Sequence, residues 1–208
     1  MHLAPREDGL AWAAEELVDA ARSFWSRGWA LGTGGNFSVR VARDPLRFAL
    51  SPTGADKGHL RIEQVLEVDE SGRVLRGQGQ PSGETPIHLS IVRARDAGAV
   101  FHTHSVWGTL VSERFAEDGG VSIFGYEMLK GLRGVATHKH REWLPVVENS
   151  QDVPKLARSI EAMLIERPEL HGFLIRGHGL YTWGEDSAEA RRHVEILEFL
   201  LEVLGRSS

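Results

Sequence analysis

The apolar run at residues 99–104 constrains the fold most, because it ends in the pattern His102-Thr103-His104. Side chains of a β-strand alternate between the two faces of its sheet, so histidines two positions apart point to the same side. Two imidazoles arranged in this way can share one metal ion, since neutral imidazole is the commonest protein ligand for metals such as zinc. A catalytic zinc usually has three protein ligands and one open position, so a third donor must come from elsewhere in the chain.

The best candidate for the third donor lies in the Arg-Gly-His-Gly turn at residues 176–179. This turn joins two short strand patterns, and its glycines let the backbone approach a ligand and leave His178 projecting. A helical pattern follows His104, so the first two histidines lie at the carboxyl end of a strand that feeds a helix. Because α/β folds place their sites at such positions, we expect His178 to join His102 and His104 there.

The chain has ten histidines, so other residues compete for this role. His138 and His140 repeat the two-apart spacing, but no apolar strand precedes them and Lys139 separates the imidazoles, so we expect weaker metal affinity and place His138 at the substrate. His88 lies in a helical pattern among apolar residues and is expected in the core or behind the site. A solvated role is expected for the histidines in polar or helix-surface contexts, which are His2, His59, His171 and His193.

Three loops before the histidine pair have the composition of an anion-binding site. Gly-Thr-Gly-Gly-Asn at residues 32–36 enters a strand, and Ser-Pro-Thr-Gly at residues 51–54 ends the next one. Their small polar side chains and free backbone N–H groups can surround an anion, although two tight hairpin turns explain the same residues equally well. The third loop precedes a helix that Ser82 can cap, which leaves Ser82, Gly83 and free amides at one corner. The glycine spacing matches no nucleotide-binding fingerprint.

Apolar periodicity predicts a mixture of helices and strands. The first helix is expected from its cap at Asp8 to about residue 28, and the last from residue 186 to about 204. Other helical segments are predicted at residues 60–64, from about 85 to a break at Gly98, and at 106–111, 125–132 and 153–166. Strands are predicted at residues 37–40, 48–50, 65–69, 74–75, 99–104, 121–123, 146–147, 172–175 and 180–184.

Composition and charge narrow the class of protein. At 208 residues, of which 41% are hydrophobic and 25% charged, the chain is expected to form one domain over residues 1–208. The formal net charge of −5 and the lack of a basic run argue against nucleic acid or an anionic membrane as partner. A polar N-terminus and no apolar stretch near the roughly 18 residues of a membrane span indicate a cytosolic protein. Without cysteine, a metal must rest on histidine and carboxylate ligands.

The chain resembles the class II aldolase/adducin-head family in five motifs, which occur in the family's order along nearly the whole sequence: Gly-Thr-Gly-Gly-Asn-Phe-Ser, Ser-Pro-Thr-Gly, Pro-Ser-Gly-Glu, His-Thr-His and Arg-Gly-His-Gly. The resemblance implies an α/β fold, a three-layer α/β/α sandwich around a mainly antiparallel sheet. It also implies a homotetramer with sites near subunit interfaces, and one zinc ion per subunit held by His102, His104 and His178. It further implies a phosphorylated sugar as substrate, with the phosphate bound by Asn36, Thr53, Gly54, Ser82 and Gly83.

Four stretches resemble the sugar-phosphate dehydratases of this family, at residues 126–132, 136–145, 149–152 and 172–181. The catalytic acid/base of those dehydratases is the glutamate of the Glu-Met-x-Lys-Gly element, which implies that role for Glu127, with Lys130 and His138 at the substrate. The aldolases of the family use the glutamate of the Pro-Ser-x-Glu element instead, here Glu84. Since both carboxylates are present, a dehydratase and a sugar-phosphate aldolase or epimerase stay open. A structural domain of the adducin type is disfavoured, because it predicts a degraded ligand set.

Overall fold

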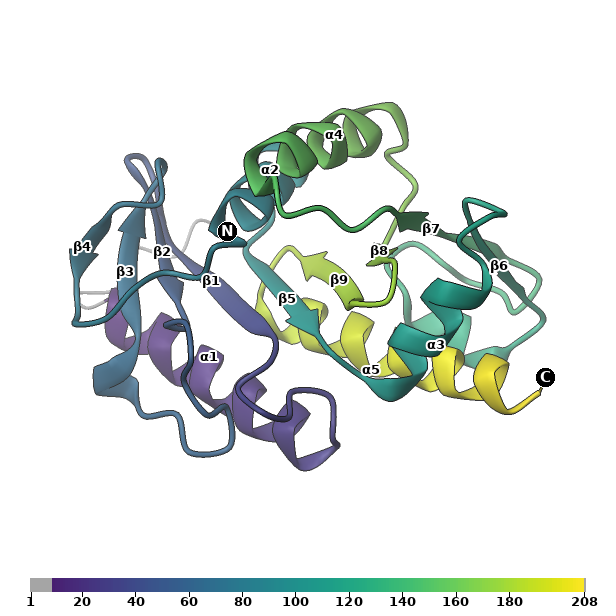
Figure 1. The fold of residues 1–208 in the computed structure, drawn as a ribbon, viewed down its shortest axis with the longest axis horizontal. Helices are drawn as coiled ribbons and strands as arrows, with labels where there is room; N and C mark the ends of the chain where they lie inside the picture. The colour runs from purple at the N-terminus through teal and green to yellow at the C-terminus, as the bar shows by residue number, and fades with distance from the viewer. Residues whose placement is uncertain (1–8, 208) are drawn as a thin grey trace.

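A computed structural model describes residues 9–207, so the predicted cap Asp8 and His2 lie outside the described residues (Figure 1). The strands are β1 (Asn36–Arg43), β2 (Leu46–Leu50), β3 (Leu66–Asp69), β4 (Val74–Arg76), β5 (Ala99–Thr103), β6 (Gly120–Phe124), β7 (Arg141–Val147), β8 (Gly172–Ile175) and β9 (Gly179–Gly184). The helices are α1 (Gly9–Ser26), α2 (Thr85–Arg95), α3 (Val106–Arg114), α4 (Val153–Glu166) and α5 (Ser187–Arg206), with short 3-10 helices η1 (Ile62–Gln64) and η2 (Glu127–Gly131).

The strands within residues 9–207 form one nine-stranded sheet, in the order β4-β3-β2-β1-β5-β9-β8-β7-β6. Among these strands every neighbouring pair is antiparallel apart from β7 and β8, which are parallel. The predicted mainly antiparallel sheet is therefore confirmed. β5, the strand that carries His102, lies at the centre of this order between β1 and β9.

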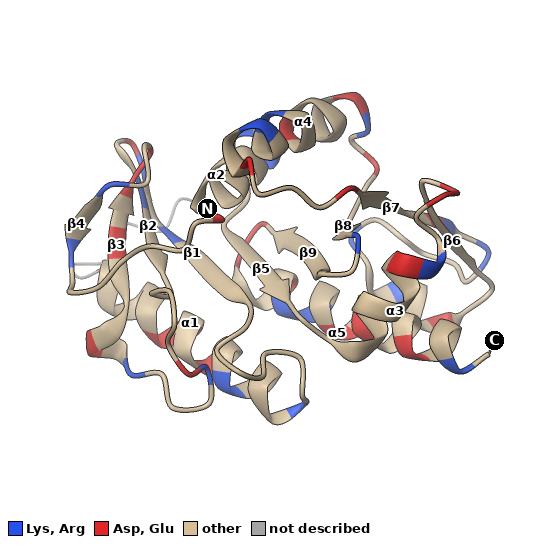
Figure 2. Cartoon of the chain, in the orientation of Figure 1, with Lys and Arg blue, Asp and Glu red and all other residues tan. Residues whose placement is uncertain are grey.

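Helices cover both faces of the sheet (Figure 1). α2 and α4 pack together on one face, whereas α1, α3 and α5 lie on the other. Alternation along β5 divides the core, because Val100 packs with Ile87 of α2 and Ile160 of α4, and Phe101 packs with Phe24 of α1. Figure 2 shows both signs of charge along α4 and α5, whose apolar sides face the sheet. The predicted three-layer α/β/α architecture is confirmed.

Two predicted boundaries are wrong. β7 begins at Arg141, five residues before the predicted start, because it pairs with β6 although Pro145, opposite Gly120, interrupts the strand pattern of the sequence. α2 ends at Arg95 rather than at Gly98, since Asp96 adopts the left-handed conformation with φ 47°. No helix among residues 9–207 combines the length and the apolar character that a membrane span requires.

A carboxyl group is buried beneath β5, on the face opposite to the His102 side chain. Glu198 of α5 is 1% exposed and accepts a hydrogen bond from the Thr103 hydroxyl. Burial raises the pKa of Glu198 to about 7, because it outweighs the hydrogen bonds from Ser105 and Thr103. The folded protein therefore favours the protonated form of this carboxyl group up to neutral pH.

The Glu198→Gln variant is expected to be more stable than the parent protein at alkaline pH. The carboxyl titrates near pH 4.5 in the unfolded chain and near pH 7 in the folded one, so its contribution to the free energy of unfolding falls as the pH rises between these values. At about 1.36 kcal/mol per pKa unit, the loss approaches roughly 3 kcal/mol. Urea unfolding of both proteins at about pH 5 and about pH 8.5 measures the difference. An equal pH slope in the two proteins would contradict the buried, protonated state.

Candidate metal centre

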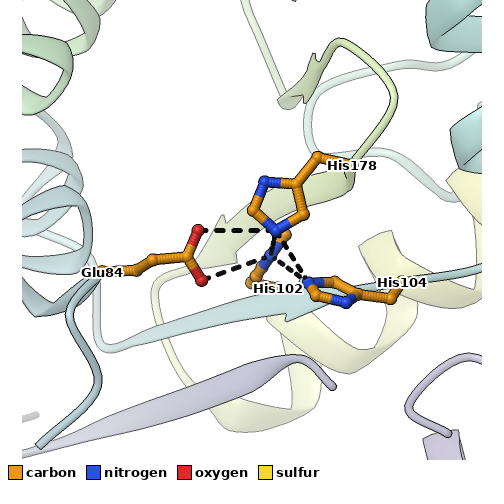
Figure 3. Close-up of side chains that lie close together, drawn as sticks. All are labelled: Glu84, His102, His104 and His178. Carbon is orange, nitrogen blue, oxygen red and sulfur yellow. Dashed lines mark hydrogen bonds and ion pairs between the residues drawn. The ribbon is translucent and has the colours of Figure 1, made fainter. Parts of the chain in front are cut away.

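Three histidine rings meet at the edge of the sheet where β5 and β8 end (Figure 3). His102 lies in β5, His104 follows this strand, and His178 lies in the turn between β8 and β9. The distances between their Nε2 atoms are 2.8 Å for His102–His104, 2.9 Å for His104–His178 and 3.2 Å for His102–His178. The structure thus brings together the three histidines that the sequence singled out.

The three Nε2 atoms face one another, and the tautomer of His102 follows from its second nitrogen. His102 Nδ1 lies 2.9 Å from the carbonyl oxygen of Leu180, which can only accept, so Nδ1 carries the proton and Nε2 the lone pair. Burial, followed by the charges of His104 and His178, lowers the pKa of His102, and burial lowers the pKa of His104 to about 4. Imidazole nitrogens that converge at about 3 Å fit a divalent ion with Zn–N distances of about 2.0–2.1 Å.

Glycines let the loops around the histidines approach this closely. A Cβ atom at Gly179 would lie 2.0 Å from the carbonyl oxygen of Thr103, and one at Gly34 would lie 2.8 Å from His104 Nδ1. Tyr181 of β9 stacks on the His102 ring, with centroids 3.9 Å apart and an interplanar angle of 10°. Backbone packing and this stacking therefore orient the imidazoles without help from a ligand.

Glu84 faces the three nitrogens from the loop that precedes α2 (Figure 3). Its two carboxylate oxygens lie 3.6 Å from His102 Nε2 and 3.6 Å from His178 Nε2. Glu84 and the three histidines each offer one ligand atom, and these atoms all lie within 4.8 Å of one another. Three imidazoles and one carboxylate can hold zinc and several other divalent metals.

A chain of hydrogen bonds orients Glu84. Asn36 Nδ2 donates to Glu84 Oε2 at 2.6 Å, and His88 Nε2 donates to Asn36 Oδ1. The Ser38 hydroxyl donates to His88 Nδ1 at 2.8 Å, and burial lowers the pKa of His88 to about 3, so this ring is neutral. The expectation that His88 lies behind the site is confirmed. Asn36, which the resemblance places at the phosphate, uses both ends of its amide to connect His88 with Glu84.

A pocket of about 150 Å³ opens beside His104 and Glu84. Ser82 lines it but does not cap α2, contrary to the prediction: its hydroxyl accepts the backbone N–H of Glu84, which is itself the N-cap residue. Gly83 does not line the pocket. The other lining residues among those predicted to bind phosphate are Asn36, Thr53 and Gly54.

Lys57 lines the same pocket and was not predicted as a site residue. Its Nζ donates to the carbonyl oxygens of Thr33, at 3.1 Å, and Ala55, at 2.9 Å, and its side chain is 1% exposed. Burial lowers the pKa of Lys57 to about 8, although the charge of Asp56 opposes this effect. The only signal in the sequence is its position four residues after Thr53, and a lysine in a polar loop is usually exposed.

The residues of the second candidate acid/base element form a separate, exposed group. Glu127 Oε2 lies 2.7 Å from Lys130 Nζ, and Glu127 Oε1 lies 3.2 Å from His138 Nδ1. The hydrogen bond and the charge of Lys130 lower the pKa of Glu127, whose side chain is 69% exposed. The structure therefore joins Glu84 to the three histidines and leaves Glu127, Lys130 and His138 at the surface of the chain.

Comparisons with known proteins agree on one family for this chain. Residues 15–204 match the model of the Class II Aldolase and Adducin N-terminal domain. The methylthioribulose-1-phosphate dehydratase of Sorangium cellulosum is 41% identical over 191 residues, which are 91% of this chain and 89% of the relative. The protein of the same name from Methylococcus capsulatus is 44% identical over 194 residues, 93% of each chain.

Solved structures share the fold. YgbL from Escherichia coli is 27% identical, with a TM-score of 0.77 over 94% of this chain and 89% of that chain. An L-fuculose 1-phosphate aldolase that is 22% identical has a TM-score of 0.76 over 94% of this chain and 85% of that chain. The similarity to the aldolase concerns the fold, while the dehydratases are similar in sequence along nearly the whole chain.

Proposed function

The chain belongs to the class II aldolase and adducin N-terminal domain family, and from this premise we propose that it is a methylthioribulose-1-phosphate dehydratase. This enzyme would be a cytoplasmic hydro-lyase of methionine salvage, which removes water from 5-methylthioribulose 1-phosphate to give 2,3-diketo-5-methylthiopentyl 1-phosphate. The observation that carries the proposal is the identity of 39–45% to relatives with this name over about nine-tenths of the chain.

The metal in this proposal is zinc, one ion per subunit at the three histidines. His102, His104 and His178 would hold it through Nε2, and Glu84 lies where it can be a fourth ligand. The ion would supply Lewis acidity beside the ketone of the substrate, where negative charge develops as a proton leaves the neighbouring carbon.

The pocket beside His104 would bind the phosphate group. Thr53 and Ser82 offer hydroxyl groups, and Gly54 offers a backbone N–H group without a side chain that blocks approach. Asn36 completes this wall. Lys57 adds the positive charge that a chain of net charge −5 needs to attract an anion.

The acid/base step in this proposal belongs to Glu127. Elimination removes the proton from C3 and the hydroxyl group from C4, and a carboxylate can take the first or, once protonated, donate to the second. Since Glu127, Lys130 and His138 are exposed and separate from the histidines of their own chain, they would act in the pocket of a neighbouring subunit of a homotetramer. Glu84 remains the alternative base, and its position at the histidines favours a second candidate function, a sugar-phosphate aldolase or epimerase.

A substrate comparison distinguishes the two functions. Purified protein is incubated with methylthioribulose 1-phosphate and, separately, with fuculose 1-phosphate and ribulose phosphate, and the products are followed by mass spectrometry. The dehydratase is expected to form the diketone from the first compound and nothing from the others. Aldehyde fragments without diketone would overturn the proposal in favour of carbon–carbon bond cleavage.

A further inference from the structure

A second group of side chains that could bind a metal lies at the opposite edge of the sheet. His140 directly precedes β7, Glu142 lies in this strand, and His171 directly precedes β8. β5, β7 and β8 run in the same direction, and His178 follows the carboxyl end of β8. The amino ends of β7 and β8 are therefore remote from the candidate metal centre, and this group is independent of it.

The donor atoms of this group converge on one carboxylate. His140 Nε2 lies 2.8 Å from Glu142 Oε2, and His171 Nδ1 lies 3.0 Å from the same oxygen. The three ligand atoms are within 4.8 Å of one another, a property that residues 9–207 share only with the centre of Glu84 and the three histidines. Glu142 is 2% exposed, so it is not a surface carboxylate paired by chance.

The backbone fixes which nitrogen of His171 is available. His171 Nε2 lies 2.8 Å from the carbonyl oxygen of Arg133, which only accepts, so Nε2 donates and Nδ1 faces Glu142. Histidine ligands of metals usually donate their second N–H to a carbonyl or carboxylate in this way, as His102 does to Leu180 in the first centre.

His193 supports this arrangement without being a ligand. It donates from Nδ1 to the Trp183 carbonyl oxygen at 2.7 Å and accepts the Arg133 backbone N–H at Nε2, so both of its nitrogens are engaged. Arg133 is thus bonded through its N–H to His193 and through its carbonyl to His171. The prediction that His171 and His193 are solvated is wrong, because the fold buries His193 and leaves His171 13% exposed.

A cavity of about 430 Å³ gives access to the donors. Both His140 and His171 line it, whereas Glu142 lies behind them. A site with two imidazoles, one carboxylate and adjoining solvent space has the donor set of a zinc ion that completes its coordination with water. The positive charge of a divalent ion would also neutralise the buried carboxylate of Glu142. Without an ion, a protonated His171 has to balance this negative charge.

We propose that His140, Glu142 and His171 bind a second divalent metal ion of the zinc class, with water from the cavity as the remaining ligand. The ion would link the start of β7 to the segment that precedes β8. The two strands pair in parallel at Val146 with Leu174 and at Val147 with Ile175, so their pairing does not extend to this site. Of the two-apart histidines 138 and 140, only the second takes part, because His138 pairs with Glu127 instead.

The number of zinc ions per chain tests the proposal. The protein is loaded with Zn²⁺, freed of excess metal by desalting and measured by plasma mass spectrometry. We expect two ions per chain in the parent, one in His140→Ala, one in His178→Ala and none in the variant that combines His178→Ala with His171→Ala. His59→Ala is the matched control, because His59 also pairs with a carboxylate, Asp56, but is exposed and has no third donor. It should keep two ions.

A thermal measurement covers the case in which a variant folds poorly. In His178→Ala the second site is the one left intact, so adding Zn²⁺ should raise the melting temperature of this variant. The rise should disappear when His140→Gln is added, a change at the rim of the cavity. One ion per chain in the parent that is unaffected by His140→Ala, or an unchanged melting temperature of His178→Ala with Zn²⁺, would overturn the proposal and leave His171 and Glu142 as an ion pair. Because these readouts need no substrate, they are independent of the proposed dehydratase activity.

Discussion

The His178→Ala variant is expected to lose the metal of the candidate centre and essentially all turnover. His178 Nε2 is one of three convergent lone pairs, and the remaining pair of His102 and His104 would have to hold the ion with Glu84 alone. Loss of residues that only support a metal ligand already costs about 10–100-fold in affinity or activity, so the loss of a ligand should exceed that. Metal content and the rate of diketone formation measure the two effects in one preparation.

The control for this variant is His59→Ala, since His59 is exposed and belongs to neither group of donors. It should retain the full rate and the full metal content. Circular dichroism of His178→Ala should match the parent, because the ring lies in a turn and its Nδ1 has no hydrogen-bond partner within the described chain. A folded His178→Ala variant that kept both metal and turnover would remove His178 from the site.

The position of the three histidines could be predicted because each rests on a local rule. Alternation in a strand places His102, and the glycines around His178 indicate a tight turn that projects its side chain. The structure adds what spacing cannot give, namely that a chain segment 74 residues away returns to within 2.9 Å of His104. The placing of His178 beside His104 was predicted from motifs that occur in the order of a known family. The periodicity of the sequence does not predict it.

Other features of the site depend on contacts between segments that are distant in sequence. Such contacts cannot be predicted from the local pattern of a single sequence. Lys57 is buried because the loops at Thr33 and Ala55 close over it, and nothing in its own loop distinguishes it from a solvated lysine. His171 and His193 have polar neighbours in sequence, yet the Arg133 backbone joins them in the interior. β7 was predicted too short since the pairing with β6 tolerates Pro145.

The Glu127→Gln variant is expected to keep its metal and to lose about 10²–10⁴-fold in turnover, the usual contribution of a general acid/base. Glutamine preserves the size of the side chain and a partner for Lys130, but cannot transfer the proton. Glu84→Gln is the informative comparison, because this carboxylate lies 3.6 Å from two of the histidine nitrogens. If Glu84→Gln loses turnover and Glu127→Gln does not, the base is Glu84. This result would favour the function of a sugar-phosphate aldolase or epimerase.

Mixed oligomers test whether Glu127 acts in a neighbouring subunit. Each of the variants Glu127→Gln and His178→Ala is expected to be inactive alone, but a subunit with intact histidines can receive Glu127 from a partner that lacks His178. Random assembly of equal amounts would place both intact elements in roughly a quarter of the sites of a symmetric oligomer, so turnover should recover to about that fraction of the parent. Recovery would explain why Glu127, Lys130 and His138 are exposed in the single chain. No recovery in verified mixed oligomers would contradict the shared site and confine catalysis to groups of one subunit, among which Glu84 is the carboxylate at the histidines.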